Sequence, residues 1–141
     1  MDPSVSDLHR KIVRGRMALR EAVEFASAAW ETRLSPRPGE SEVWSPRETA
    51  EHAITTEFWF ASLIGVMAGI TVPRVHGLEL ASPTEAIVFL EQMSIVVDEI
   101  YARLAVEHLE RETDVGRTVA SVMRWSAWHL HDHAKQIVGV T

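Results

Sequence analysis

Three of the chain's seven histidines, His129, His131 and His133, lie within five residues of one another near the C-terminal end of the sequence. The surrounding residues predict a helix, on which side chains four positions apart share a face with Cβ atoms roughly 6 Å apart. His129 and His133 are therefore spaced to bind one metal ion together. His131 is two residues from each and points to the other side of the helix, so we leave it out of the predicted ligand set.

Two imidazoles alone hold a metal ion poorly, so the prediction needs a third ligand from another helix. His52 is the candidate, because it falls on the same predicted stripe as Thr56, Trp59 and Leu63 and should face the interior. Three neutral imidazoles leave one or two positions for water or substrate, as in catalytic zinc sites. The predicted cofactor is a divalent ion, and the spacing does not choose among Zn, Ni and Fe.

Each histidine considered alone is more typical of an ordinary core or surface residue, and only the combination favours a metal site. His76 is expected on the surface, and His108 is expected near a helix C-terminus, where a histidine commonly interacts with the helix dipole. Three acidic residues are candidates to orient a ligand imidazole through a hydrogen bond, namely Glu48, Glu57 and Asp132.

The composition fits one domain over residues 1–141, with 46% hydrophobic and 24% charged residues. A net charge of −6 argues against a general nucleic-acid-binding protein. The chain has no cysteine, so neither a disulfide nor a protein thiolate is available. The apolar run from Phe58 to Ile70 is shorter than the roughly 20 residues of a membrane span. We expect a soluble, cytoplasmic protein.

The pattern predicts four helices, over residues 6–34, from Pro46 to about 70, 83–109 and 115–138. The second and third begin with the same Ser-Pro-x-Glu signal, at Ser45 and Ser82, in which the serine caps the helix. Asp114 is the candidate N-cap of the fourth helix. Four helices without a strand pattern indicate an all-α antiparallel four-helix bundle, with one longer crossover connection expected.

The first two helices differ in how their apolar residues are distributed. In the first, an apolar stripe is flanked by basic residues that are expected to lie on a solvated face, among them Arg16. Beyond Phe58 the second helix is apolar nearly all round and needs cover on every side. Either a homodimer interface covers it or the following loop does, and the sequence favours the two explanations equally.

The segment Trp44-Ser45-Pro46-Arg47-Glu48, with His52 four residues on and His129-x-x-x-His133-x-x-Gln136 far downstream, resembles the DinB-like metal-binding four-helix bundle superfamily. This superfamily includes damage-inducible proteins and the bacillithiol and mycothiol S-transferases. The similarity covers nearly the whole chain. It implies that His52, His129 and His133 are the metal ligands and that the protein is a homodimer. It also implies, for the members that are enzymes, a divalent metal that activates a low-molecular-weight thiol.

A metal bound by three neutral histidines keeps its full charge and would deprotonate a coordinated thiol, whose thiolate is the nucleophile. Arg10, Arg14 and Arg124 are candidates to bind carboxylates of such a thiol. We therefore expect a metal-dependent thiol S-transferase of detoxification or stress response. The alternatives are a non-catalytic metal-binding homodimer and, third, a metal-dependent hydrolase. A ferritin-like di-iron site needs Glu-x-x-His pairs on two helices, and the sequence has none.

Overall fold

The computed structural model of the chain describes residues 2–41, 43–73 and 75–140, and within them it forms an all-helical bundle. The four long helices are α1 (Pro3–Phe25), α2 (Pro46–Gly65), α3 (Pro83–Ala102) and α4 (Val119–Val140). Two short 3₁₀ turns, η1 (Ser27–Ala29) and η2 (Val106–His108), lie in the connections. Among these residues the only strand-like feature is an isolated bridge between Glu112 and Thr118. The predicted all-α four-helix bundle is confirmed.

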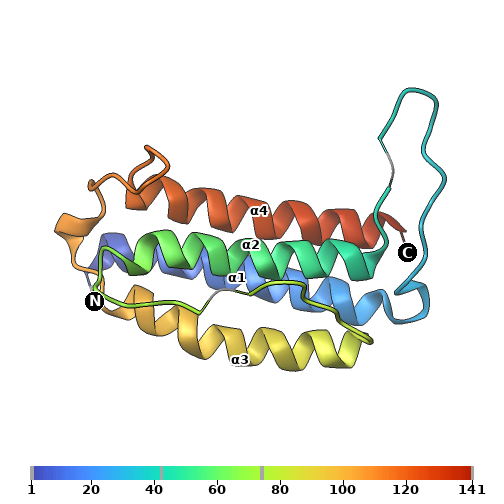
Figure 1. Cartoon of the computed structure of the whole chain (residues 1–141), viewed down its shortest axis with the longest axis horizontal. Helices are drawn as coiled ribbons and strands as arrows, with labels where there is room; N and C mark the ends of the chain where they lie inside the picture. Colours follow the sequence, from blue (N-terminus) through green and yellow to red (C-terminus); the bar gives the residue numbers. More distant parts are fainter. Residues whose placement is uncertain (1, 42, 74, 141) are drawn as a thin grey trace.

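The expected long crossover is the segment between α2 and α3, which runs back along the bundle (Figure 1). As a result α3 runs in the same direction as α2, and α4 in the same direction as α1. The helices α1 and α2 lie across the bundle from each other, and each packs against both α3 and α4. The α2–α4 interface, from which the histidines come, is thus antiparallel.

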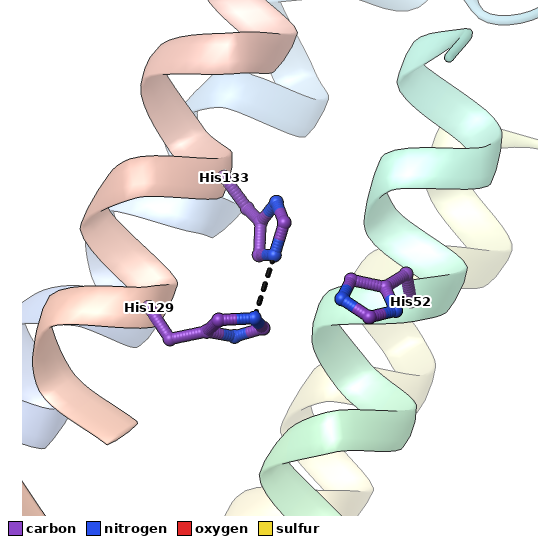
Figure 2. A group of neighbouring side chains, drawn as sticks. All are labelled: His52, His129 and His133. Carbon is purple, nitrogen blue, oxygen red and sulfur yellow. Dashed lines mark hydrogen bonds between the residues drawn. The ribbon is translucent and has the colours of Figure 1, made fainter. Parts of the chain in front are cut away.

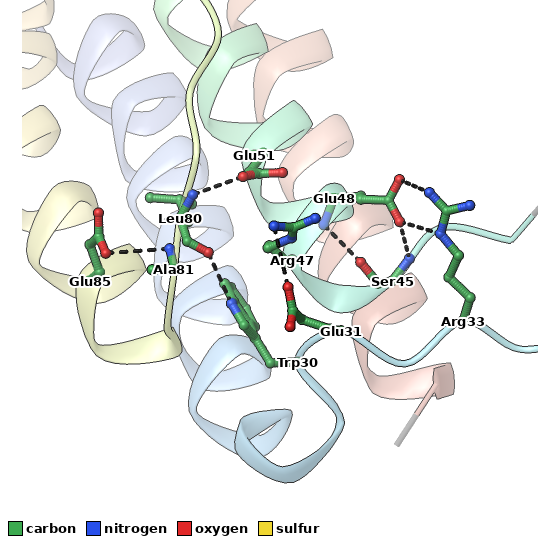
Figure 3. A network of polar contacts seen from close by, with 10 residues as sticks. All are labelled: Trp30, Glu31, Arg33, Ser45, Arg47, Glu48, Glu51, Leu80, Ala81 and Glu85. Atoms are coloured by element: carbon green, nitrogen blue, oxygen red, sulfur yellow. Dashed lines mark hydrogen bonds and ion pairs between the residues drawn. The ribbon is translucent and has the colours of Figure 1, made fainter.

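The end of the crossover is bound to the start of α2 and to the segment after α1 (Figure 3). The backbone N–H of Leu80 donates to Glu51, at 2.8 Å, and the Trp30 indole N–H donates to the Leu80 carbonyl, at 3.1 Å. The α2 N-terminus carries the predicted capping box, in which Ser45 and Glu48 each accept a backbone N–H of the other. These contacts fix the register of α2, and so the position of His52.

The largest differences from the predicted helix boundaries are at four ends, mostly because the apolar spacing continues into segments that are no longer α-helix. The helix α1 ends at Phe25 rather than Leu34, and α3 ends at Ala102 rather than Leu109. The helix α2 ends at Gly65, before residue 70, where the N–H of Ile70 bonds back to the Gly65 carbonyl. The helix α4 begins at Val119, four residues later than predicted.

The N-cap prediction for α4 was also wrong. The hydroxyl of Thr118 rather than the Asp114 carboxylate accepts a first-turn N–H, that of Ser121, at 3.1 Å. Asp114 lies in the connection instead, and its side chain is exposed. A threonine directly before the helix satisfies the orphan donor in the same way as the aspartate would have.

The core contains the predicted stripe of α1 but also a charged residue of that helix. Arg16, expected on a solvated face, is only 7% exposed. Its guanidinium lies 2.9 Å from Glu57 of α2, without hydrogen-bond alignment, and also pairs with Asp98 of α3. Asp98 in turn accepts from His9 of α1 at 2.8 Å. We call Arg16, Glu57, Asp98 and His9 the ionic layer; it links three helices through the bundle interior.

No helix within the described residues has both the length and the apolar character needed to cross a membrane.

Candidate metal centre

The three predicted ligands come together between α2 and α4 (Figure 2). One nitrogen from each of His52, His129 and His133 lies within 4.8 Å of the others. The two α4 rings are nearly perpendicular to each other, with Nε2 atoms 2.8 Å apart, and His52 projects toward them from α2. Metal–nitrogen bonds of about 2.0–2.1 Å in tetrahedral geometry place ligand nitrogens roughly 3.3 Å apart. Small rotations of the rings reach that spacing, so this histidine triad could hold a metal ion.

A hydrogen-bond chain from Asp132 through Gln136 determines which His133 nitrogen is free to bind. The Gln136 amide N–H donates to the Asp132 carboxylate at 3.3 Å, which turns the amide oxygen toward His133. That oxygen only accepts, so His133 Nδ1 carries the proton that it donates, at 2.8 Å. In the neutral ring the lone pair is then on Nε2, the atom that faces the triad.

Burial favours the unprotonated form of His52 and His129, the form that metal binding needs. Burial in the bundle, together with the charges of His133 and His52, lowers the pKa of His129 to about 4. Burial and the His133 charge also lower the pKa of His52. Three imidazoles crowded together cannot all be cations, and near neutral pH these two expose lone pairs. Among the described residues the cluster contains histidines alone, so a cation bound by these three neutral imidazoles would keep most of its charge.

The triad opens to a hollow of about 390 Å³ at the N-terminal end of α2, which we call the mouth. His133 and Gln136 line it from α4, and Trp44, Val43 and Thr49 line it from the α2 side. The Trp44 ring meets the His52 ring edge to face, with centroids 4.9 Å apart, although 42% of Trp44 is exposed. A ligand could therefore reach the triad past this indole.

The three acidic residues predicted to orient a ligand imidazole, Asp132, Glu48 and Glu57, make different contacts. Asp132 contributes through Gln136, as described above. Glu48 instead binds Arg33 through two hydrogen bonds of 2.5 and 2.6 Å, which lower its pKa to about 2. Glu57 pairs with Arg16 in the ionic layer. The predictions for Glu48 and Glu57 were wrong, because each carboxylate pairs with an arginine from another segment of the chain.

The arginines expected to bind a carboxylate-bearing thiol lie away from the mouth. Arg10 pairs with Asp7 on the surface of α1. Arg14 and Arg124 line a shallow groove between α1 and α4, together with Trp128 and His131. This groove shares no residue with the mouth. Among the described residues that line the mouth there is no lysine or arginine.

Sequence reasoning missed the aromatic residues that surround the triad. Phe60 contacts His129 with ring centroids 5.8 Å apart, and it also contacts Trp125, at 4.8 Å, and Trp59, at 5.2 Å. The apolar residues after His52 could have indicated the position of Phe60, since positions i and i+8 belong to the same broad face of an amphipathic helix. The remaining histidines lie outside the cluster: His131 and His76 are exposed, and His108 Nδ1 accepts the Ala105 N–H.

Comparison with known proteins gives no match to a protein-family model, a curated protein or a solved structure. The resemblance to the DinB-like superfamily therefore stays a prediction that rests on the quoted motifs.

Proposed function

We propose that this protein is a metal-dependent S-transferase, in which the histidine triad binds a divalent ion that activates a low-molecular-weight thiol. The observation that carries the proposal is the convergence of three imidazoles, from two helices, beside an open mouth. An open position on a three-histidine metal site is typical of a catalytic rather than a structural centre. The DinB-like motifs point to the same chemistry.

In the proposed reaction, the residues of the site have separate roles. The triad would hold Zn, Ni or Fe, and the ion would supply the positive charge that favours a bound thiolate. Gln136, which accepts the His133 Nδ1 proton, would leave the Nε2 lone pair of that ring free for the ion. In the transfer, the thiolate forms an S–C bond to the electrophile as a halide leaves or an epoxide C–O bond breaks. In the second case the alkoxide takes up a proton equivalent to the one that the thiol lost.

One feature of the chain fits thiol chemistry. The absence of cysteine means that no internal thiolate competes for the ion. A non-catalytic metal-binding homodimer is the second candidate, since the exposed Trp59 and Val66 of α2 offer apolar surface for a partner copy.

The first experiment is elemental analysis of untagged protein, with His133→Ala in parallel. We expect close to one equivalent of metal per chain, lost in the variant. Thiol-dependent consumption of an electrophilic probe, also lost in the variant, would then support the transferase. Metal-dependent stability without thiol turnover would favour the non-catalytic protein, and turnover without thiol would favour the hydrolase. Absence of metal after exposure to zinc, nickel and iron would contradict all three.

A further inference from the structure

A cationic surface lies on the side of the bundle where α1 and α4 are neighbours. Lys11 and Arg14 of α1 line a hollow of about 380 Å³ together with Arg124 and Trp128 of α4. The two α4 residues also line an adjoining hollow of about 400 Å³, to which Arg117 contributes. We call Lys11, Arg14, Arg117, Arg124 and Trp128 the cationic groove. It is continuous because the two hollows share two of these residues.

The groove is formed by the spacing of these residues and by the close packing of the two helices. The two α1 cations are three positions apart, and the arginine and tryptophan of α4 are four apart, so each pair shares one helix face. The helices approach closely at Gly15, where an added Cβ would lie 2.9 Å from the Leu130 Cβ. The two pairs therefore form opposite walls of one groove.

The cations of the groove differ from most other arginines of the chain, because within the described residues they have no acidic partner. Arginines elsewhere pair with carboxylates, namely Arg10, Arg16, Arg20, Arg33, Arg47 and Arg103. Asp7, one turn before Lys11, pairs with Arg10. Glu42, the acidic side chain outside the described ranges, is next in sequence to Val43, which lines the mouth instead. Like charges held together repel, and a bound anion would relieve that repulsion.

Two indole rings belong to the same surface. Trp128 is 61% exposed, so much of its ring is open to a ligand. Trp125 lines the second hollow, and the Arg117 guanidinium carbon lies 4.4 Å from its ring centroid, a cation–π contact that holds this charge at the groove. An exposed indole among unpaired cations suits a ligand that has both a planar ring and negative charge, because stacking and charge pairing then act together.

We propose that the cationic groove binds a small phosphorylated ligand of the nucleotide class, with its phosphate oxygens on Lys11, Arg14 and Arg124 and its base stacked on Trp128. Several positive charges without a counter-charge favour a multiply charged phosphate over a single carboxylate, and the guanidinium fork matches phosphate oxygens. Both hollows are within the size range of small-molecule sites.

A free nucleotide fits these observations better than a nucleic-acid strand. The chain has a net charge of −6, so a strand that extended beyond the groove would meet a mainly negative surface. The groove shares no residue with the triad or the mouth, and the proposal does not depend on the proposed S-transferase function.

Isothermal titration calorimetry of the untagged full chain tests the proposal, with adenosine diphosphate, pyrophosphate and adenosine as probes. A chelator in the buffer prevents phosphate from binding to a metal at the triad. We expect adenosine diphosphate to bind at least tenfold more tightly than adenosine, which lacks the charge. It should also bind at least threefold more tightly than pyrophosphate, which lacks the ring.

Substitutions at exposed positions separate the two parts of the site. Arg124→Gln should weaken adenosine diphosphate at least tenfold, because this residue lines both hollows. Trp128→Ala should weaken the same probe at least fivefold and leave pyrophosphate unchanged, since the ring contacts only the base. Arg103→Gln is the matched control, because Arg103 is an exposed arginine on α3 that pairs with Glu99, and it should change neither affinity. The circular dichroism of all three variants should match the wild type.

Absence of adenosine diphosphate binding, equal binding of adenosine, or full affinity in Arg124→Gln would overturn the inference. So would loss of binding in His133→Ala, because the nucleotide would then lie at the triad. Binding of oligothymidylate or of phosphatidylserine vesicles, by a protein that binds no adenosine diphosphate, would assign the groove to a nucleic acid or a membrane and would also overturn it. Failure of the proposed S-transferase looks different, since nucleotide binding is expected whether or not the triad holds a metal.

Discussion

Two polar clusters interrupt the apolar interior of the bundle, and they satisfy their charges in different ways. In the ionic layer, the buried Arg16 pairs with the buried Glu57 and with the partly exposed Asp98, so a cation meets anions of the same chain. The histidine triad gathers three groups of one kind with no counter-charge among them. Burial of a polar group without a partner is unfavourable. The first cluster therefore pairs its charges within the chain, whereas the second gathers imidazole nitrogens whose lone pairs a metal ion could accept.

The comparison separates a structural role from a binding role. Removing a member of the ionic layer should cost stability, because it leaves an unpaired charge in the interior. Removing a member of the triad should cost metal binding and little stability of the metal-free protein. The following predictions test this distinction.

The largest expected effect is on Arg16. Arg16→Met leaves Glu57 buried without its cation, which should lower the free energy of unfolding by about 3–5 kcal/mol. Urea unfolding at pH 7.5 measures the change. The double variant Arg16→Met/Glu57→Leu should regain most of the loss. Arg20→Met is the matched control, because Arg20 is an exposed arginine on the same helix, and it should cost less than about 1 kcal/mol. A small loss in Arg16→Met would show that the layer is not a structural element.

The next effect concerns the triad. Saturating metal at about 100 times the dissociation constant should stabilise the wild type by about 2.7 kcal/mol. His133→Ala should lose this gain and melt near the metal-free wild type, as thermal unfolding with and without zinc would show. His131→Ala, two residues away and exposed, should keep the full gain. Loss of stability in metal-free His133→Ala as large as in Arg16→Met would contradict a binding role.

A smaller effect is expected for Gln136, which holds His133 in the binding tautomer. Gln136→Ala should weaken metal affinity about 10–100-fold, the usual cost of losing a partner that orients a ligand. Competition with a chromophoric chelator measures this affinity. Lys135→Ala, at the neighbouring exposed position, should leave it unchanged. Unchanged affinity in Gln136→Ala would mean that His133 needs no orienting partner.

The smallest expected effect is the pH dependence of the stability contributed by the ionic layer. Burial raises the pKa of Glu57 to about 7, against an ordinary value of 4.5, although Arg16 opposes the shift. The folded state then binds the proton more tightly than the unfolded state. The stability contribution of this group is full below pH 4.5 and is lost as the pH rises through about 7.

Comparing wild type with Glu57→Gln isolates that contribution, because Asp98, His9, Tyr101 and Arg16 face the same position in both proteins. Free energies of unfolding measured between pH 4.5 and 8 should show the wild type losing stability relative to the variant as the pH rises. A difference that stays flat over this range would show that Glu57 does not titrate there.

The helical pattern and the spacing of the histidine pair on α4 were predictable for local reasons. Apolar spacing, the serine caps before α2 and α3, and the four-residue separation of His129 and His133 depend on contacts within one or two turns. Helix ends were less predictable, because the same apolar spacing continues through η1 and η2, where the chain has already left the α-helix. Arg16 was misplaced because its neighbours in sequence do not reveal a carboxylate on the helix across the bundle.

The sequence by itself determined four amphipathic helices and a histidine pair, since both follow from backbone geometry and side-chain order along one helix. Only the tertiary structure decided that His52 meets that pair, because this depends on the register of α2 against α4. It also decided the pairing of Arg16 with Glu57 and the position of the mouth beside the triad. The physical reason is that long-range packing, rather than local propensity, selects which faces of the helices meet.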